Sequence, residues 1–177
     1  MVSNATLTGA AGEHHVLSEL LRNGYVAGLA PVGTKDIDIV VVNEDGSRFA
    51  SIQVKTRRGA KDGGWPMRKK HESITNDRIF YAFVDFQTRK KDARPLVFVI
   101  PSKVVAKTIA EEHRQYLLKP GKGGIKPKSS DMRNLWPHYK HWKECPANWL
   151  DKYKDAWGSL GLETIDPDKP VTEAAEG

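Results

Sequence analysis

Several sequence features are scarce or missing in this chain of 177 residues. It has one cysteine, Cys145, which excludes an internal disulfide and favours a reducing compartment. No apolar run approaches the ~20 residues that a membrane-spanning helix needs. The N-terminus lacks a basic stretch followed by an apolar one, the pattern of a secretory signal. These absences predict a cytoplasmic protein without a membrane partner.

Motifs of several common enzyme classes are also missing. No Ser/His/Asp pattern is evident, and Cys145 has no evident base, which argues against nucleophilic catalysis. The stretch KPGKGGIKPKSS, residues 119–130, lacks the Gly-Lys-Ser/Thr ending of a phosphate-binding P-loop. His138, His141 and Cys145 follow an H-x-x-H-x-x-x-C pattern that could seed a zinc site, but the paired spacing of a zinc finger is absent. We expect these three residues to be ordinary surface or core groups.

Charge is distributed unevenly along the chain. The formal net charge is +6, with residues 51–150 net basic and both ends net acidic. An acidic segment followed by a long basic one suits a polyanion held near a cation site. The alternative is an ordinary basic surface. We expect contact with nucleic acid.

The most informative stretch is residues 33–57, GTKDIDIVVVNEDGSRFASIQVKTR. Residues 36–42 and 48–56 are rich in strand-forming side chains and flank turn residues 43–47, which predicts a β-hairpin. Since strand side chains alternate between faces, Asp36 and Asp38 share one face, and Gln53 and Lys55 share one face of the second strand.

The length of the turn decides whether these two polar pairs meet. A four-residue loop over 44–47 places Asp38 opposite Gln53 and Asp36 opposite Lys55. A slip of one residue would separate the pairs onto opposite faces. We predict the four-residue loop. The alternative is a solvated hairpin face with an incidental ion pair.

A carboxylate also falls on the first expected helix, residues 8–24, which Thr8 can cap and Asn23-Gly24 can end. Its apolar arc includes Val16 and Leu20, and Glu13 lies in the middle of that arc. A buried carboxylate is costly unless it is paired, hydrogen-bonded or bound to a metal. The alternative is a partly exposed first turn, where the helix dipole favours an acid.

The remaining pattern predicts one domain over residues 1–160. Strands are expected at 25–30, 79–86 and 96–100, and a helix at 101–118. Residues 57–78 look like a basic loop with one or two helical turns around 67–73, and residues 131–160 like a Trp-rich helical extension with its last helix from Asn148 to Leu160. Residues 161–177 are expected to form a disordered acidic tail.

Basic and aromatic side chains after the hairpin are candidate nucleic-acid contacts. The cations can bind phosphates, and a tryptophan can stack on a base or anchor the loop to the domain. The candidates are Arg57, Arg58, Lys61, Trp65, Arg68, Lys69, Lys70, Lys122 and Lys126.

The acids, the amide and the lysine together fit phosphodiester hydrolysis. Carboxylate and amide oxygens from Glu13, Asp36, Asp38 and Gln53 suit Mg²⁺ or Mn²⁺. Such a cation polarises a phosphoryl oxygen and lowers the pKa of a bound water. Lys55 beside it can stabilise charge in the transition state or orient the attacking water.

These residues carry a resemblance to a known family. Gly12-Glu13 on an opening helix, then Asp36-Ile-Asp38, then Gln53-Val-Lys55 after a turn, resembles the PD-(D/E)XK nuclease superfamily, which includes restriction endonucleases and Holliday-junction resolvases. The resemblance covers about residues 8–118. It implies an α/β fold with a restriction-endonuclease-like core, in which helices flank a central mixed β-sheet.

The resemblance also implies roles. Glu13 resembles the helix acid, Lys55 the motif lysine, and Asp38 the metal-binding aspartate, with Asp36 as the alternative. Gln53 stands where Asp or Glu is usual, as in Q-x-K branches of the superfamily.

The implied activity is divalent-metal-dependent endonuclease cleavage of DNA, in defence, repair or a mobile element. Double-stranded DNA is the expected partner, and a homodimer would suit cleavage of both strands. The alternatives are a non-catalytic nucleic-acid-binding module of the same fold and an RNA-directed nuclease.

Overall fold

Five strands form a mixed sheet in the computed structural model, which describes residues 3–59, 63–87, 92–120, 124–139, 142 and 144–166. Their spatial order is β1 (Val26–Leu29), β2 (Ile39–Val42), β3 (Phe49–Arg57), β5 (Ile79–Asp85) and β6 (Leu96–Pro101). The β3–β5 pair is parallel and the other neighbours are antiparallel. The expected mixed sheet is therefore confirmed.

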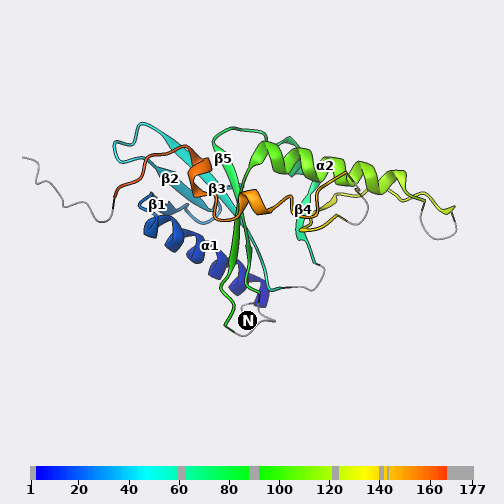
Figure 1. Ribbon diagram of the computed structural model, residues 1–177, viewed down its shortest axis with the longest axis horizontal. Coiled ribbons are helices and arrows are strands. Elements are labelled where there is room, and N and C mark those ends of the chain that lie inside the picture. The colour runs from blue at the N-terminus through cyan, green and yellow to red at the C-terminus, as the bar shows by residue number, and fades with distance from the viewer. Residues whose placement is uncertain are drawn as a thin grey trace, which may run out of the picture.

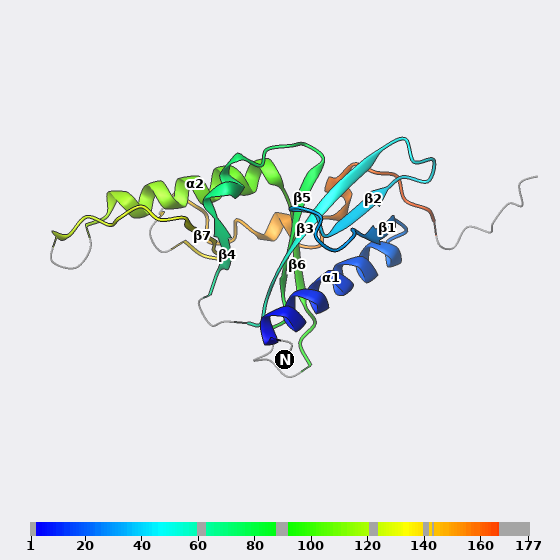
Figure 2. The same cartoon turned by 180° about the vertical axis from the view of Figure 1, so that it is seen from behind.

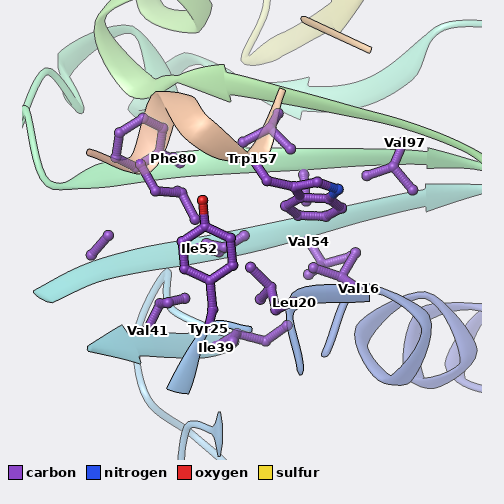
Figure 3. Packing of buried hydrophobic residues seen from close by; sticks show 14 of the residues in the cluster. Val16, Leu20, Tyr25, Ile39, Val41, Ile52, Val54, Phe80, Val97 and Trp157 are labelled. Atoms are coloured by element: carbon purple, nitrogen blue, oxygen red, sulfur yellow. The ribbon is translucent and has the colours of Figure 1, made fainter. Parts of the chain in front are cut away.

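Two helices, α1 (Asn4–Arg22) and α2 (Ser102–Leu118), cover opposite faces of this sheet (Figure 1). The alternation of side chains along β5 separates the two faces. Phe80 points to the α1 side and belongs to the same buried cluster as Leu20 (Figure 3). Tyr81 and Phe83 point to the α2 side and cluster with Ile109. The chain thus has the predicted α/β architecture with flanking helices.

Helix α1 begins earlier than the sequence suggested. Ser3 caps it by accepting a hydrogen bond from the Thr6 amide, and Thr8, the predicted cap, lies one turn inside the helix. The helix ends as predicted at Asn23-Gly24, where Gly24 has a φ of 78° that favours glycine.

A second, two-stranded sheet lies beside α2. It pairs β4 (Trp65–Arg68) with β7 (Met132–Leu135), as Figure 2 shows. The 3₁₀ helix η1 (Lys69–Ser73) follows β4 directly, at the place where one or two helical turns were predicted. Residues 65–68 are therefore a strand rather than loop, because a distant segment supplies their hydrogen-bonding partner.

The expected helix from Asn148 to Leu160 is wrong. The structure has two 3₁₀ turns instead, η3 (Asp151–Tyr153) and η4 (Trp157–Leu160). Asp155, between them, has a φ of 48°, which a continuous right-handed helix excludes. Leu150, Trp157 and Leu160 are buried, and their packing determines the course of the backbone through residues 150–160. The spacing of these apolar residues in the sequence reflects that packing and not a helix.

The expected disordered tail is ordered over its first residues. The amide of Ile165 donates to the Gly24 carbonyl at 2.8 Å, and the exposed Arg48–Glu163 pair is 2.9 Å apart. The prediction of a tail starting at residue 161 is therefore wrong for 161–166, and 167–177 lie outside the described residues. Within the described part of the chain, no helix is both long and apolar enough to cross a membrane.

Candidate active site

The candidate site lies where β3 extends beyond its pairing with β2. The register pairs Ile39 with Ile52, and the amide of Asn43 donates to the Arg48 carbonyl at 3.1 Å. This register confirms the four-residue loop. Strand β2 starts only at Ile39, so from Gln53 onward β3 has lost its strand neighbour on this side.

Asp38 occupies the point where the two strands separate. Its amide donates to the Ile52 carbonyl at 2.9 Å, and its carbonyl accepts from Ala30 at 2.9 Å. Its Oδ2 accepts a 2.7 Å hydrogen bond from the amide of Val54. The carboxylate is therefore fixed against the backbone of the Gln53-Val54-Lys55 motif.

Glu13 reaches the same point from α1 because the helix approaches β3 very closely. A Cβ atom added at Gly12 would lie 1.8 Å from Thr56 Oγ1, so only glycine fits this contact. The half-buried Glu13 has a raised pKa, caused first by burial and second by the Asp38 carboxylate. The Asp38 charge therefore adds to the cost of ionising Glu13, and a cation bound near both carboxylates would lower that cost.

Gln53 and Lys55 lie on the α2 side of β3. Gln53 is buried, and its Oε1 finds no hydrogen-bond donor among the described residues. The pKa of the half-buried Lys55 ammonium is lowered, mainly by burial, although the neighbouring Asp38 charge opposes this shift. An unsatisfied oxygen thus lies next to a lysine that is poorly solvated.

Asp36 is not placed as predicted. It lies before β2 with a left-handed backbone (φ 59°), so it is not a strand residue opposite Lys55. Its carboxylate forms an ion pair with Lys70. The pKa of Asp36 is lowered, primarily by the hydrogen bond from Lys70 and to a smaller extent by Gln53. Asp36 therefore borders the site but is already engaged with a cation.

Two buried residues complete the surroundings, and the sequence analysis did not single them out. They are His71 on η1 and Tyr81 on β5. A hydrogen bond of 2.9 Å links His71 Nδ1 to the Tyr81 hydroxyl. Burial, with Lys55 and Lys70 close by, lowers the pKa of His71 to about 4, so the ring is neutral at pH 7. No local pattern indicates this contact, because β5 is the parallel neighbour of β3 and η1 reaches it from the second sheet.

The donor set fits a divalent cation that keeps several of its waters. Glu13 and Asp38 supply carboxylates, and the unsatisfied Gln53 Oε1 supplies a third hard oxygen. No group of three or more His, Cys, Asp or Glu side chains arranged for a metal occurs among the described residues. A cation here would therefore depend on the amide and on water in addition to two acids.

Of the candidate nucleic-acid contacts, Trp65 is wrong because it is fully buried, and Arg57 is engaged in contacts within the fold. Trp65 is fully buried and donates its indole N–H to the Val84 carbonyl at 3.0 Å, so it cannot stack on a base. Arg57 lies over the Trp65 ring at 4.0 Å and forms a 2.6 Å ion pair with Asp85. Both residues hold β4 against the main sheet.

The other basic candidates are consistent with surface contacts. Arg68, Lys69, Lys70 and Lys126 are exposed, with Arg68 also pairing with Asp131 at 3.1 Å. Arg58 is exposed too. Lys61 and Lys122 lie outside the described residues.

The residues of the possible zinc pattern show other contacts. His138 Nδ1 lies 2.8 Å from the Ala147 carbonyl, and Cys145 is a half-buried free thiol. His141 lies outside the described residues.

Comparison with known proteins gives a likeness of fold. No family model matches this sequence, and no curated protein sequence matches it. The structure is similar to that of I-Ssp6803I, a bacterial homing endonuclease, with a TM-score of 0.50 and 15% sequence identity. The similarity covers 88% of this chain and 91% of that chain. The two chains therefore share a fold.

Proposed function

We propose that this chain is a divalent-metal-dependent endonuclease that hydrolyses DNA, of the PD-(D/E)XK type with a Q-x-K motif. One observation carries the proposal. Asp38 is hydrogen-bonded to β3 between the unsatisfied Gln53 oxygen and the half-buried Lys55, and the charge of Glu13 on α1 interacts with that of Asp38. Two carboxylates and an amide oxygen that could hold a cation thus accompany an ammonium, a combination that suits metal-dependent phosphodiester hydrolysis.

Each residue has a chemical role in this proposal. Asp38, Gln53 and Glu13 would hold Mg²⁺ or Mn²⁺, with Asp36 outside this ligand set because it pairs with Lys70. When bound, the cation supplies Lewis acidity at a phosphoryl oxygen and lowers the pKa of a bound water. Lys55 stabilises the negative charge that develops on the phosphate in the transition state.

The choice of DNA as substrate rests on two supporting facts. The fold resembles that of a homing endonuclease, and the chain has an excess of basic residues, several of them exposed near the site. Exposed lysines and arginines bind the phosphate backbone of duplex DNA without reading its sequence.

A cleavage assay tests the proposal. Supercoiled plasmid, linear duplex, branched DNA and RNA are incubated with Mg²⁺, with Mn²⁺ and with a chelator. We expect metal-dependent cutting of DNA that is lost in Lys55→Ala, while the exposed-lysine control Lys154→Ala cuts as the wild type does.

The alternative function is a binding module that has lost catalysis, which the neutral Gln53 favours because an amide binds a cation less strongly than a carboxylate. Salt-sensitive DNA binding without cutting of any substrate, and without Mn²⁺ binding in a calorimetric titration, would support that alternative. Cutting of RNA alone would replace DNA as the substrate.

A further inference from the structure

Lys70 reaches the candidate site from a part of the fold outside the main sheet. It lies on η1, which continues β4 and so depends on pairing with β7. The segment is further held by an ion pair between Glu72 and the buried Arg133. The second sheet therefore positions a lysine at the site formed by the β2–β3 hairpin and α1.

The Lys70–Asp36 pair is accessible enough to exchange partners. The Lys70 side chain is 49% exposed, whereas that of Asp36 is 19% exposed. Lys70 also borders a groove of about 410 Å³ whose lining includes Lys69 and Ser73. Half-exposed ion pairs contribute little net stability, so the ammonium can leave Asp36 for a stronger anion at small cost.

The residue next to Lys70 is fixed in place. His71 is buried on Tyr81, with the two rings edge to face at 5.8 Å between centroids. This contact anchors η1 on β5, and the half-exposed Lys70 side chain extends from the anchored segment. Lys70 lies near enough to Lys55 that its charge lowers the pKa of Lys55.

The site is therefore bipolar. The Glu13 and Asp38 carboxylates form one end, where negative charge is in excess. Lys55 and Lys70 form the other end, where the two ammonium groups repel each other and the Asp38 and Asp36 carboxylates offset that repulsion. A cation at the first end and an anionic phosphate at the second would relieve both repulsions.

We propose that Lys70 is a second phosphate-binding lysine of this site, which Asp36 holds in the absence of substrate and which moves to the phosphate oxygen of a bound phosphodiester. The inference rests on the proposed function for its reaction, but the binding of the phosphate can be measured without cleavage. Asp36 then acts as a holding group for the lysine, which explains why an acid at the edge of the site lies outside the proposed metal-ligand set.

The binding test uses a dinucleoside monophosphate of thymidine, which contains one phosphodiester, together with Mg²⁺. NMR signals of the lysine side chains, assigned by substitution, are followed during titration. We expect the Lys55 and Lys70 signals to shift together, and the signal of the exposed Lys154, which lies outside the site, to stay unchanged. Asp36→Asn should tighten binding about two- to threefold, because Lys70 no longer has to leave a carboxylate.

The cleavage test compares Lys70→Met with Lys154→Met on duplex DNA under single-turnover conditions. Lys70→Met should lower the rate at saturating DNA by on the order of 100-fold, the usual effect of losing one group that stabilises transition-state charge. Lys154→Met, which removes an exposed lysine outside the site, should leave the saturated rate unchanged. Lys70→Arg, which keeps the charge, should retain binding of the dinucleoside monophosphate.

The outcomes separate this inference from the proposed function. If the wild type cuts DNA but Lys70 does not respond to the dinucleoside monophosphate and both lysine variants behave alike, the role of Lys70 is overturned and the nuclease stands. If Lys55 and Lys70 respond but the wild type cuts nothing, the phosphate site stands and the enzyme proposal fails. If Lys70 does not respond and nothing is cut, both are overturned.

Discussion

Asp36 and Asp38 are two positions apart and have different roles in the structure. Asp38 is fixed by the backbone of β3 and lies next to Glu13. Asp36 adopts a left-handed backbone conformation and pairs with Lys70. Because the Asp38 charge interacts with that of another acid while Asp36 pairs with a cation, the two residues should differ in their effect on metal binding.

We predict that Asp38→Asn weakens Mn²⁺ binding by roughly tenfold or more, as removal of a metal ligand or its charge commonly does. Asp36→Asn should change it by less than about threefold. The asparagine at 38 can still accept the Val54 amide, so the fold is retained, and asparagine tolerates the left-handed backbone at 36. Calorimetric titration measures both constants. A larger loss at Asp36 would contradict the assignment.

His71 ties the stability of the protein to pH. Its pKa falls from 6.5 to about 4 on folding, because the ring is buried and Lys55 and Lys70 are near, whereas Asp36 and Asp131 oppose the shift only weakly. Between these two values the unfolded chain binds more protons than the folded one, so stability decreases as pH falls through this window.

We predict that protonation of His71 in the unfolded chain lowers the free energy of unfolding by about 3 kcal/mol when the pH falls from 7 to 4. His71→Gln, which does not titrate but can still hydrogen-bond Tyr81, should lose less stability than the wild type over that range. Urea denaturation at the two pH values gives the comparison. Equal losses in both proteins would show that His71 is not the responsible group.

At the scale of elements, the contact between α1 and β3 places Glu13. Gly12 allows the helix backbone to approach Thr56, and Val16 and Leu20 bury the same face further along. Glu13 is therefore positioned by the packing of α1 as a whole. The distance between α1 and β3 depends on the lack of a side chain at Gly12.

We predict that Gly12→Ala destabilises the protein by about 1–3 kcal/mol, the usual cost of overpacking, and weakens Mn²⁺ binding because Glu13 moves with the helix. Gly9→Ala is the matched control in the same helix. A Cβ at Gly9 meets no atom within 4 Å, so alanine there should stabilise the protein by about 0.5–1 kcal/mol. Thermal unfolding of the two variants measures this, and similar shifts would refute the close-contact argument.

Sequence reasoning succeeds for elements that are specified locally. The register of the β2–β3 hairpin follows from the turn at residues 43–48, and the shared face of Gln53 and Lys55 follows from strand alternation. The place of Glu13 on the inner side of α1 follows from helix periodicity. It fails where distant segments meet. Strand β4 requires β7, and the burial of Trp65 and the approach of Lys70 to Asp36 follow from that pairing.

At the scale of the whole molecule, the basic side chains fall into two groups, those in internal ion pairs and those exposed at the surface. Some basic side chains form ion pairs within the fold: Arg57 pairs with Asp85, and Arg133 pairs with Glu72. Others, such as Lys69 and Lys126, are exposed. Net charge alone does not distinguish these groups, so the basic surface is smaller than the composition suggests.

We predict that binding to duplex DNA weakens more than about tenfold between 50 and 200 mM salt, through release of counterions from the phosphates. Lys126→Ala should reduce the slope of log affinity against log salt by about 1, whereas Lys154→Ala should leave it unchanged. Fluorescence anisotropy at several salt concentrations provides the slopes. A flat response would remove the basic surface as the DNA-binding feature.

The pairing of β4 with β7 has a consequence for the order of folding. The β2–β3 hairpin is local and can close once residue 57 has been made, but β4 gains its partner only after Leu135 leaves the ribosome. Lys70 is therefore brought to Asp36 only after residues 132–135 have been made. A chain interrupted before β7 contains Glu13, Asp38 and Lys55 but lacks the pairing that positions Lys70, so the proposed site is complete only once β7 has paired with β4.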